Sequence, residues 1–119
     1  MMATANFSAA IEDLKRRIHG IATALVGRDG QVRFASVPDG TYAETFAIMC
    51  ATMFGAAATA NTELARGRAI RVVVEGDDST TVIVGAGRWA LLAVVVPNDG
   101  DLARVFAEVE RFADLLRVD

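Results

Sequence analysis

The sequence has only one cysteine, one histidine and one lysine, and each scarcity excludes a class of site. A single cysteine, Cys50, cannot form a disulfide within the chain, and its apolar neighbours indicate an inert core thiol. His19 has no second histidine and no cysteine near it in the sequence, so we expect no metal site there. Lys15 lies in a predicted helix, outside any glycine-rich phosphate loop. The run Gly85-Ala86-Gly87-Arg88 joins two predicted strands, so it is expected to be a hairpin turn, because a dinucleotide site needs a following helix. The sequence therefore predicts neither a metal nor a cofactor.

A combination of residues typical of catalysis is also missing. Ser36 and Ser79 have no identifiable base beside them in the sequence. The adjacent acids Asp77 and Asp78 lie in a predicted turn, where carboxylates are usually solvated charges. Nothing in the sequence selects an arginine finger from the six arginines considered: Arg28, Arg33, Arg66, Arg68, Arg71 and Arg88. We expect a protein that is not an enzyme.

Length and charge indicate one small acidic domain. The chain of 119 residues has a net charge of −3, which argues against nucleic acid as its main partner. Hydrophobic residues make up 53% of the sequence and charged residues 23%, so a folded core is expected. Residues 1–119 are predicted to form a single domain whose first residues, 1–6, are frayed. The start of the sequence shows no signal peptide, so a cytoplasmic location is expected.

One stretch, from Thr45 to Thr62, contains no charged residue. It lies within a predicted helix from Thr41 to Arg66, which would be about 39 Å long. Helical spacing places the large side chains on one broad side, which we expect to face the chain's own sheet: Phe46, Met49, Cys50, Met53 and Phe54. The other side is neither charged nor bulky, and it consists of Ile48, Ala51, Thr52, Gly55, Ala58, Thr59 and Thr62.

A helix that is weakly apolar all round is normally buried on both sides. The small-residue side is therefore predicted to pack against another molecule, with a second copy of the chain as the preferred partner. Two alternatives compete with this interpretation. The stretch is near the lower length limit of a membrane span, but Gly55, Asn61 and the threonines dilute it, so no span is expected. The helix could also be the core helix of a monomer, because exposed alanine, glycine and threonine are tolerable.

The remaining elements are predicted from hydrophobic period and turn residues. A first helix begins near Phe7 and ends at Gly20, and a last helix runs from Asp99 or Asp101 to Leu116. Strands are predicted over 21–27, 31–37, 68–75, 80–84 and 88–96. The order α-β-β-α-β-β-β-α defines an α/β (α+β) fold, with a five-stranded, mostly antiparallel sheet between the long central helix and the two terminal helices. The last three strands are apolar on both faces, so helices are expected to cover both faces.

The strand over 31–37 is more polar than the strands that follow it, which suits the edge of a sheet. Val32 and Phe34 are predicted to point to one face of the sheet. The opposite positions on this strand are Gln31, Arg33 and Ala35. An open edge of this kind is available for pairing with another chain.

This pattern resembles the Roadblock/dynein light chain family over nearly the whole chain, from about Phe7 to Leu116. The resemblance is carried by the segment GIATALVGRDGQVRFAS at 20–36, the alanine-rich central helix, the run RAIRVVVEG at 68–76 and the final strand WALLAVVVPNDG at 89–100. The family lacks invariant catalytic residues, so the resemblance implies none here.

The resemblance implies a prokaryotic homodimer that binds a Ras-like small GTPase as a non-enzymatic regulator or scaffold. In such proteins the second strand pairs with its copy and the long helices pack side by side. This would place Gln31, Arg33, Ala35 and the small-residue side of the helix in the dimer interface. Two alternatives remain open: a dimerising adaptor that only assembles other proteins, and a small-ligand sensor with a cavity between sheet and helix.

Overall fold

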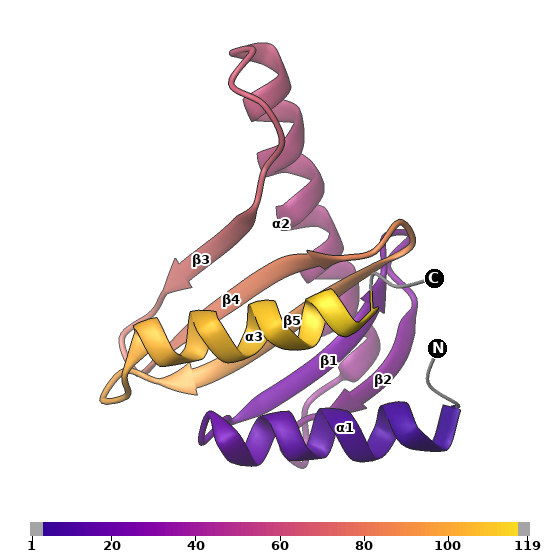
Figure 1. Cartoon of the computed structure of the whole chain (residues 1–119), viewed down its shortest axis with the longest axis vertical. Helices are drawn as coiled ribbons and strands as arrows, with labels where there is room; N and C mark the ends of the chain where they lie inside the picture. Colours follow the sequence, from indigo (N-terminus) through magenta and orange to yellow (C-terminus); the bar gives the residue numbers. More distant parts are fainter. Residues whose placement is uncertain (1–3, 117–119) are drawn as a thin grey trace.

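A computed structural model describes residues 4–116 of the chain, with side chains from residue 7 onward (Figure 1). The elements follow one another in the order α-β-β-α-β-β-β-α, which confirms the predicted fold class. Their bounds are α1 (Thr4–Arg17), β1 (Ala22–Gly27), β2 (Val32–Ser36), α2 (Ala43–Glu63), β3 (Arg71–Glu75), β4 (Ser79–Ala86), β5 (Ala90–Pro97) and α3 (Leu102–Leu116). Of the predicted frayed segment, residues 1–3 lie outside the described residues, whereas residues 4–6 belong to α1.

The five strands form one antiparallel sheet in the order β2-β1-β5-β4-β3, so β2 and β3 are its two edges. The predicted hairpin turn is present but lies at 87–89, because Gly85 and Ala86 still belong to β4 and pair with Leu91 and Ala90. Gly87 begins the turn with a φ of 83°. In Figure 1, α1 and α3 lie against one face of the sheet and α2 crosses the other. This is the three-layer arrangement expected from the element order.

The larger part of the core lies between the sheet and the two terminal helices. Successive strand residues point to opposite faces, so alternate positions of β1, β4 and β5 face these helices. Burying one such aliphatic side chain stabilises the fold by about 1.5–3 kcal/mol. The main buried residues of this layer are Ile11, Leu14, Ile18, Leu25, Val82, Val84, Leu92, Val94, Val105, Val109 and Phe112.

Helix α2 covers the opposite face with a thinner contact. Its fully buried residues are Ala47, Cys50 and Phe54. They pack on the intervening positions of the sheet, which are Ala24, Val26, Ile83, Leu91 and Ala93. In Figure 1, α2 crosses the sheet obliquely, and its C-terminal half rises beyond the sheet together with the segment that leads into β3. Much of the surface of α2 is therefore left without cover from its own chain.

Strand β3 corrects one prediction, because it was expected to be covered by helices on both faces. Val73 and Val74 are 37% and 40% exposed, and Ile70, just before the strand, is 67% exposed. The physical reason is position: β3 is an edge strand that pairs only with β4, and of its residues only Val72 packs into the core beneath α2. The same valine-rich sequence that would be core in a central strand is therefore partly surface here.

Helix α2 is shorter at both ends than the predicted 41–66. It starts after Tyr42, whose side chain makes no capping hydrogen bond. At the other end, the backbone N–H of Arg66 donates to the carbonyl of Asn61 (3.0 Å), and that of Ala65 donates to the carbonyl of Thr62 (3.0 Å). These two bonds form a Schellman motif, which places Ala65 in the left-handed region with a φ of 51°. An alanine adopts that conformation at a cost of about 1 kcal/mol.

The other two helices also end close to their predicted limits. α1 ends at Arg17, and the N–H of Gly20 then donates to the carbonyl of Lys15 (2.8 Å). Gly20 therefore lies beyond the helix and caps its C-terminus. At the start of α3, a carboxylate oxygen of Asp101 accepts a hydrogen bond from the backbone N–H of Arg104 (3.2 Å). Asp101 is therefore the capping residue of the two that were predicted.

Candidate interaction surface

The exposed side of α2 forms one uncharged stripe, which we call the neutral face. It consists of Thr45, Ile48, Met49, Thr52, Gly55, Ala56, Thr59 and Ala60, all of them exposed. Ile48 and Met49 are each 49% exposed, an unusual position for two large apolar side chains side by side. The charged residues of the helix, Glu44 and Glu63, lie at its two ends. A partner that binds this stripe therefore does not have to remove water from charged side chains.

Met49 lies on the neutral face, which corrects its predicted place among the sheet-facing residues. The buried side of α2 is centred on Ala47, Cys50 and Phe54. Each helical residue is turned by about 100° from the one before it, so Met49 points well away from Cys50. The helix is rotated in this way because the small side chain of Ala47 fits closely against Ala24 and Val26 of β1.

The predicted interface residues of α2 divide into two groups. Those on or beside the neutral face are exposed: Ile48, Thr52, Gly55, Thr59 and Thr62. The other two are half-buried by the chain itself. Ala51 packs against the residues around Cys50 and Ala47, and Ala58 lines a cleft described below. Ala51 and Ala58 therefore flank the surface rather than form its centre.

Two threonines, Thr52 on the neutral face and Thr62 beside it, direct their hydroxyls to their own helix. The hydroxyl of Thr52 donates to the carbonyl of Ile48 (2.8 Å), and that of Thr62 donates to the carbonyl of Ala58 (3.1 Å). These threonines therefore keep their hydroxyls on their own helix. A Cβ added at Gly55 would meet no atom of the chain within 4 Å, so this position is open to a close approach from outside.

The predicted residues of β2 lie at one edge of the sheet. Arg33 and Ala35 are exposed, whereas Val32 and Phe34 are half-buried, which confirms the predicted alternation. Gln31 is exposed and precedes the strand, and its backbone N–H donates to a carboxylate oxygen of Asp29 (3.1 Å). The structure thus places Gln31, Arg33 and Ala35 on an accessible edge. The other edge of the sheet is β3, which carries the exposed Val73 and Val74.

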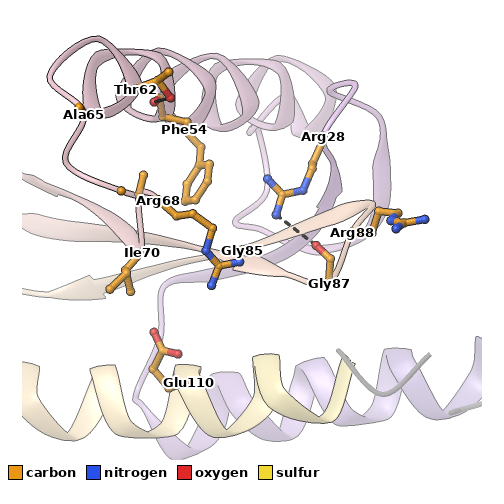
Figure 2. Close-up of a pocket in the computed structure, with 13 residues that line it drawn as sticks. Arg28, Phe54, Thr62, Ala65, Arg68, Ile70, Gly85, Gly87, Arg88 and Glu110 are labelled. Atoms are coloured by element: carbon orange, nitrogen blue, oxygen red, sulfur yellow. Dashed lines mark hydrogen bonds between the residues drawn. The ribbon is translucent and has the colours of Figure 1, made fainter.

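A cleft of about 1000 Å³ opens between the C-terminal half of α2 and the β4–β5 hairpin (Figure 2). Its walls come from α2, from the segment at 65–70 and from the turns that carry Arg28 and Gly87. Phe54 points down from α2 into the cleft, and Glu110 points up toward it from α3. We call this space the α2–hairpin cleft. It is an open cleft rather than the enclosed cavity that a small-ligand sensor would need.

Sequence reasoning did not find this cleft. Arg28, Arg68 and Arg88 were noted only among the arginines that nothing distinguished. They are far apart in the sequence but line one cleft. Arg28 and Arg88 reach it because the β1–β2 turn and the β4–β5 turn lie at the same end of neighbouring strands, and Arg68 reaches it from the connection between α2 and β3. The pairing of β1 with β5 would have brought Arg28 and Arg88 together, so the signal was in the topology rather than in a motif.

The chemistry of single side chains gives little indication of catalysis. Cys50 is fully buried, and burial raises the pKa of its thiol to about 11, so it is not a reactive nucleophile at neutral pH. Among residues 7–116, no group of three or more His, Cys, Asp and Glu side chains could hold a metal ion. The predicted inert character of Cys50 is thus supported by its environment.

Helix α2 alone among the described helices is long and apolar enough to cross a membrane, with a mean hydropathy of 1.3. This is weak evidence for a span, since core helices of soluble proteins meet the same criterion. Only 17% of the apolar window is buried within the chain. Most of this apolar window is therefore exposed on the single chain.

Comparison with known proteins identifies relatives of the same small size. A sequence profile of the Roadblock/LC7 domain matches residues 11–96. An uncharacterised protein of Methanocaldococcus jannaschii is 29% identical over 93 residues, which cover 78% of this chain and 81% of that protein. The profile match spans the strands, α2 and the second half of α1.

Two solved structures share the fold. The chain resembles MglB from Myxococcus xanthus with a TM-score of 0.91 at 16% identity, covering 98% of this chain and 89% of the other. It resembles a structure described as MglB with tetrameric arrangement with a TM-score of 0.87 at 22% identity, covering 98% and 90%. At these identities the likeness is one of fold, and the match to the domain profile is what identifies the family. The chain belongs to the Roadblock/LC7 domain family.

Proposed function

We propose that the protein is a non-enzymatic homodimer that binds a Ras-like small GTPase and acts as its regulator or scaffold in the cytoplasm. The observation that carries the proposal is the neutral face of α2. It holds Ile48 and Met49 half-exposed around an open Gly55, with no charge between Glu44 and Glu63. A second copy of the same helix would bury this stripe by packing small residues against small residues.

A stable interface buries about 800 Å² on each partner. The accessible surface of this chain is 7184 Å², so pairing would bury roughly a ninth of it. The neutral face and one adjoining sheet edge together could supply that area. Pairing through α2 is also consistent with the tetrameric arrangement described for one MglB, a protein of the same fold.

The sheet has two edges, β2 and β3, and either one would extend the dimer interface beyond α2. The family resemblance pointed to β2, where Arg33 is charged and exposed. Charged residues on an edge strand normally protect it from pairing. β3 instead offers Val73 and Val74, both partly exposed, and Val74 shares its face of the strand with Val72, which packs on the α2 side of the core. We therefore propose β3 as the pairing edge, with β2 as the competing one.

The GTPase partner is proposed from family membership and from the fold shared with MglB. A regulator of this kind acts through its surface and needs no catalytic residue of its own. Its effect would come from holding the mobile segments of the GTPase in one conformation. The dimer would present two copies of each surface, so one GTPase would contact both copies or each copy would bind one.

The direct test is GTP hydrolysis and nucleotide exchange by the small GTPase from the same genome, measured with and without the protein. A change in either rate, together with a complex that elutes as one species, would support a regulator. A complex without a change in rate would favour the adaptor role instead. If no complex forms and neither rate changes, the proposed partner is wrong.

A further inference from the structure

The α2–hairpin cleft carries an excess of positive charge in an acidic protein. Arg28, Arg68 and Arg88 line it, and Glu110 is its only acidic residue among the described ones. Glu110 already has a partner, since one of its carboxylate oxygens lies 3.7 Å from a guanidinium nitrogen of Arg71. Among residues 7–116, none of the three cleft arginines forms an ion pair with a carboxylate. The cleft therefore presents unpaired cations on a chain whose net charge is −3.

Arg28 is held in place before any ligand arrives. Its guanidinium donates a hydrogen bond to the carbonyl of Gly87 (3.1 Å) and lies 5.6 Å from the centre of the Phe54 ring. A Cβ at Gly85 would lie only 2.9 Å from the Arg28 guanidinium, so a larger residue there would displace the end of the arginine side chain from this position. A charge fixed in this way loses less conformational entropy when it binds a partner.

The three guanidinium groups are spread along the cleft and do not converge on one point. In Figure 2, Arg28 and Arg68 lie on either side of the Phe54 ring, and Arg88 points away at the outer rim beyond Gly87. A single phosphate would need several donors around one centre. Three separated charges instead match a chain that carries several carboxylates at intervals.

The cleft also has the apolar contacts that a peptide chain needs. Ala58, Ala69 and Ile70 also line it, and Ile70 is 67% exposed. Next to the cleft residue Arg88, Trp89 is 73% exposed, but its side chain borders a separate hollow with Phe7 and Leu116. The backbone of the same turn still supports the cleft, because the carbonyl of Trp89 accepts a hydrogen bond from the backbone N–H of Arg28 (2.9 Å). Arginine is among the residue types that dominate binding energy at protein interfaces.

We propose that the α2–hairpin cleft is a docking site for an acidic, extended segment of a partner protein. The carboxylates of the segment pair with Arg28, Arg68 and Arg88, and its apolar side chains contact Ile70 and the alanines of the cleft wall. This site is separate from the neutral face. Ala58 and Thr62, which were predicted to lie in the dimer interface, also line the cleft, so the cleft borders the surface that a second copy would cover. The proposal does not depend on the identity of a GTPase.

The test uses Trp89, the only tryptophan of the chain, as a fluorescent reporter, because it directly follows the cleft residue Arg88. The probe is an end-capped peptide of alternating glutamate and leucine without aromatic residues, titrated into the full-length protein. A peptide with glutamine in place of glutamate is the neutral comparison. We expect the acidic peptide alone to shift the emission of Trp89, with an affinity that falls as salt is added.

The variant Arg68→Ser removes one cleft cation, and Arg104→Ser makes the same charge change on exposed α3 away from the cleft. We expect Arg68→Ser to weaken peptide binding about tenfold, as the loss of one charge-assisted contact would, and Arg104→Ser to leave it unchanged. Equal binding by both variants, or no binding of the acidic peptide, would overturn the proposal. So would a response to inorganic polyphosphate or to vesicles with anionic lipid that exceeds the response to the peptide.

Discussion

At the scale of single residues, Cys50 is a titratable side chain that is fully removed from water. It is completely buried against Phe54 and the β5 strand, and burial raises the pKa of its thiol from its ordinary value of 9.0 to about 11. The sequence predicted this inert role correctly, because a thiol among apolar helix neighbours has nothing nearby to stabilise its charged form.

This shift predicts a pH dependence of stability above pH 9. Because the folded pKa lies above the unfolded one, the stability contributed by the thiol is present below pH 9 and is lost as the pH rises toward 11. We expect the free energy of unfolding to fall by about 1 kcal/mol per pH unit more in the wild type than in Cys50→Ala over this range. Urea unfolding at several pH values measures it, and equal slopes would contradict the burial of this group.

The backbone conformation of Ala65 lowers the free energy of unfolding by a measurable amount. Its φ of 51° is one that glycine adopts freely and alanine does not. The variant Ala65→Gly should therefore raise the free energy of unfolding by about 0.5–1 kcal/mol, despite the larger entropy of glycine in the unfolded chain. Ala60→Gly, inside α2, is the matched control and should lower it by about 1 kcal/mol. A loss of stability in both variants would argue against the left-handed end of α2.

At the scale of elements, α2 shows both what the sequence could predict and what it could not. Its existence and its uncharged stretch followed from the residues, since eighteen or so neutral positions with helical spacing have few other solutions. Its rotation did not follow, because periodicity alone does not distinguish Met49 from Ala51 as the buried neighbour of Cys50. The contact of Ala47 with β1 decides it, and that contact depends on the tertiary packing.

The two edge strands also show what the sequence could and could not predict. The polar alternation of β2 predicted an edge correctly, whereas the valines of β3 predicted a covered strand. Apolar residues on an edge are ambiguous in a single sequence, because they mark either a buried strand or a surface that a partner covers. The exposed valines of β3 are thus the residues where prediction from sequence failed and where an interface is now proposed.

The open position at Gly55 predicts a specific effect on association. A leucine there would project from the neutral face without touching its own chain, so the fold should be retained. We expect Gly55→Leu to abolish or strongly weaken self-association in sedimentation velocity, because two helices could no longer approach closely. Ala103→Leu, a similar enlargement on exposed α3, should associate like the wild type. If the Gly55→Leu profile is unaltered, the small-residue packing of α2 is wrong.

At the scale of the whole molecule, the sheet has two open edges and only one is expected to continue into a second copy. A lysine on an edge strand opposes pairing. We expect Val74→Lys on β3 to weaken the dimer at least about tenfold and Ala35→Lys on β2 to leave it intact. Dilution series in an analytical ultracentrifuge compare the two variants. The opposite order of effects would restore β2 as the pairing edge.

The sequence predicted the element order, the three layers and the uncharged helix, because these depend on periodicity and turn residues along the chain. The α2–hairpin cleft could not be predicted in the same way. Arg28, Arg68 and Arg88 lie on three separate connections, and they meet only after β1 has paired with β5 and β4 with β3. Sites built from such distant residues need the topology before they can be recognised.

The account depends most on the claim that a second copy covers the neutral face of α2. Sedimentation equilibrium of the unmodified protein across the micromolar range tests this claim directly. We predict one species with twice the mass of a single chain, which dissociates only on strong dilution. A single chain at every concentration, with Ile48 and Met49 left in contact with water, would contradict the account.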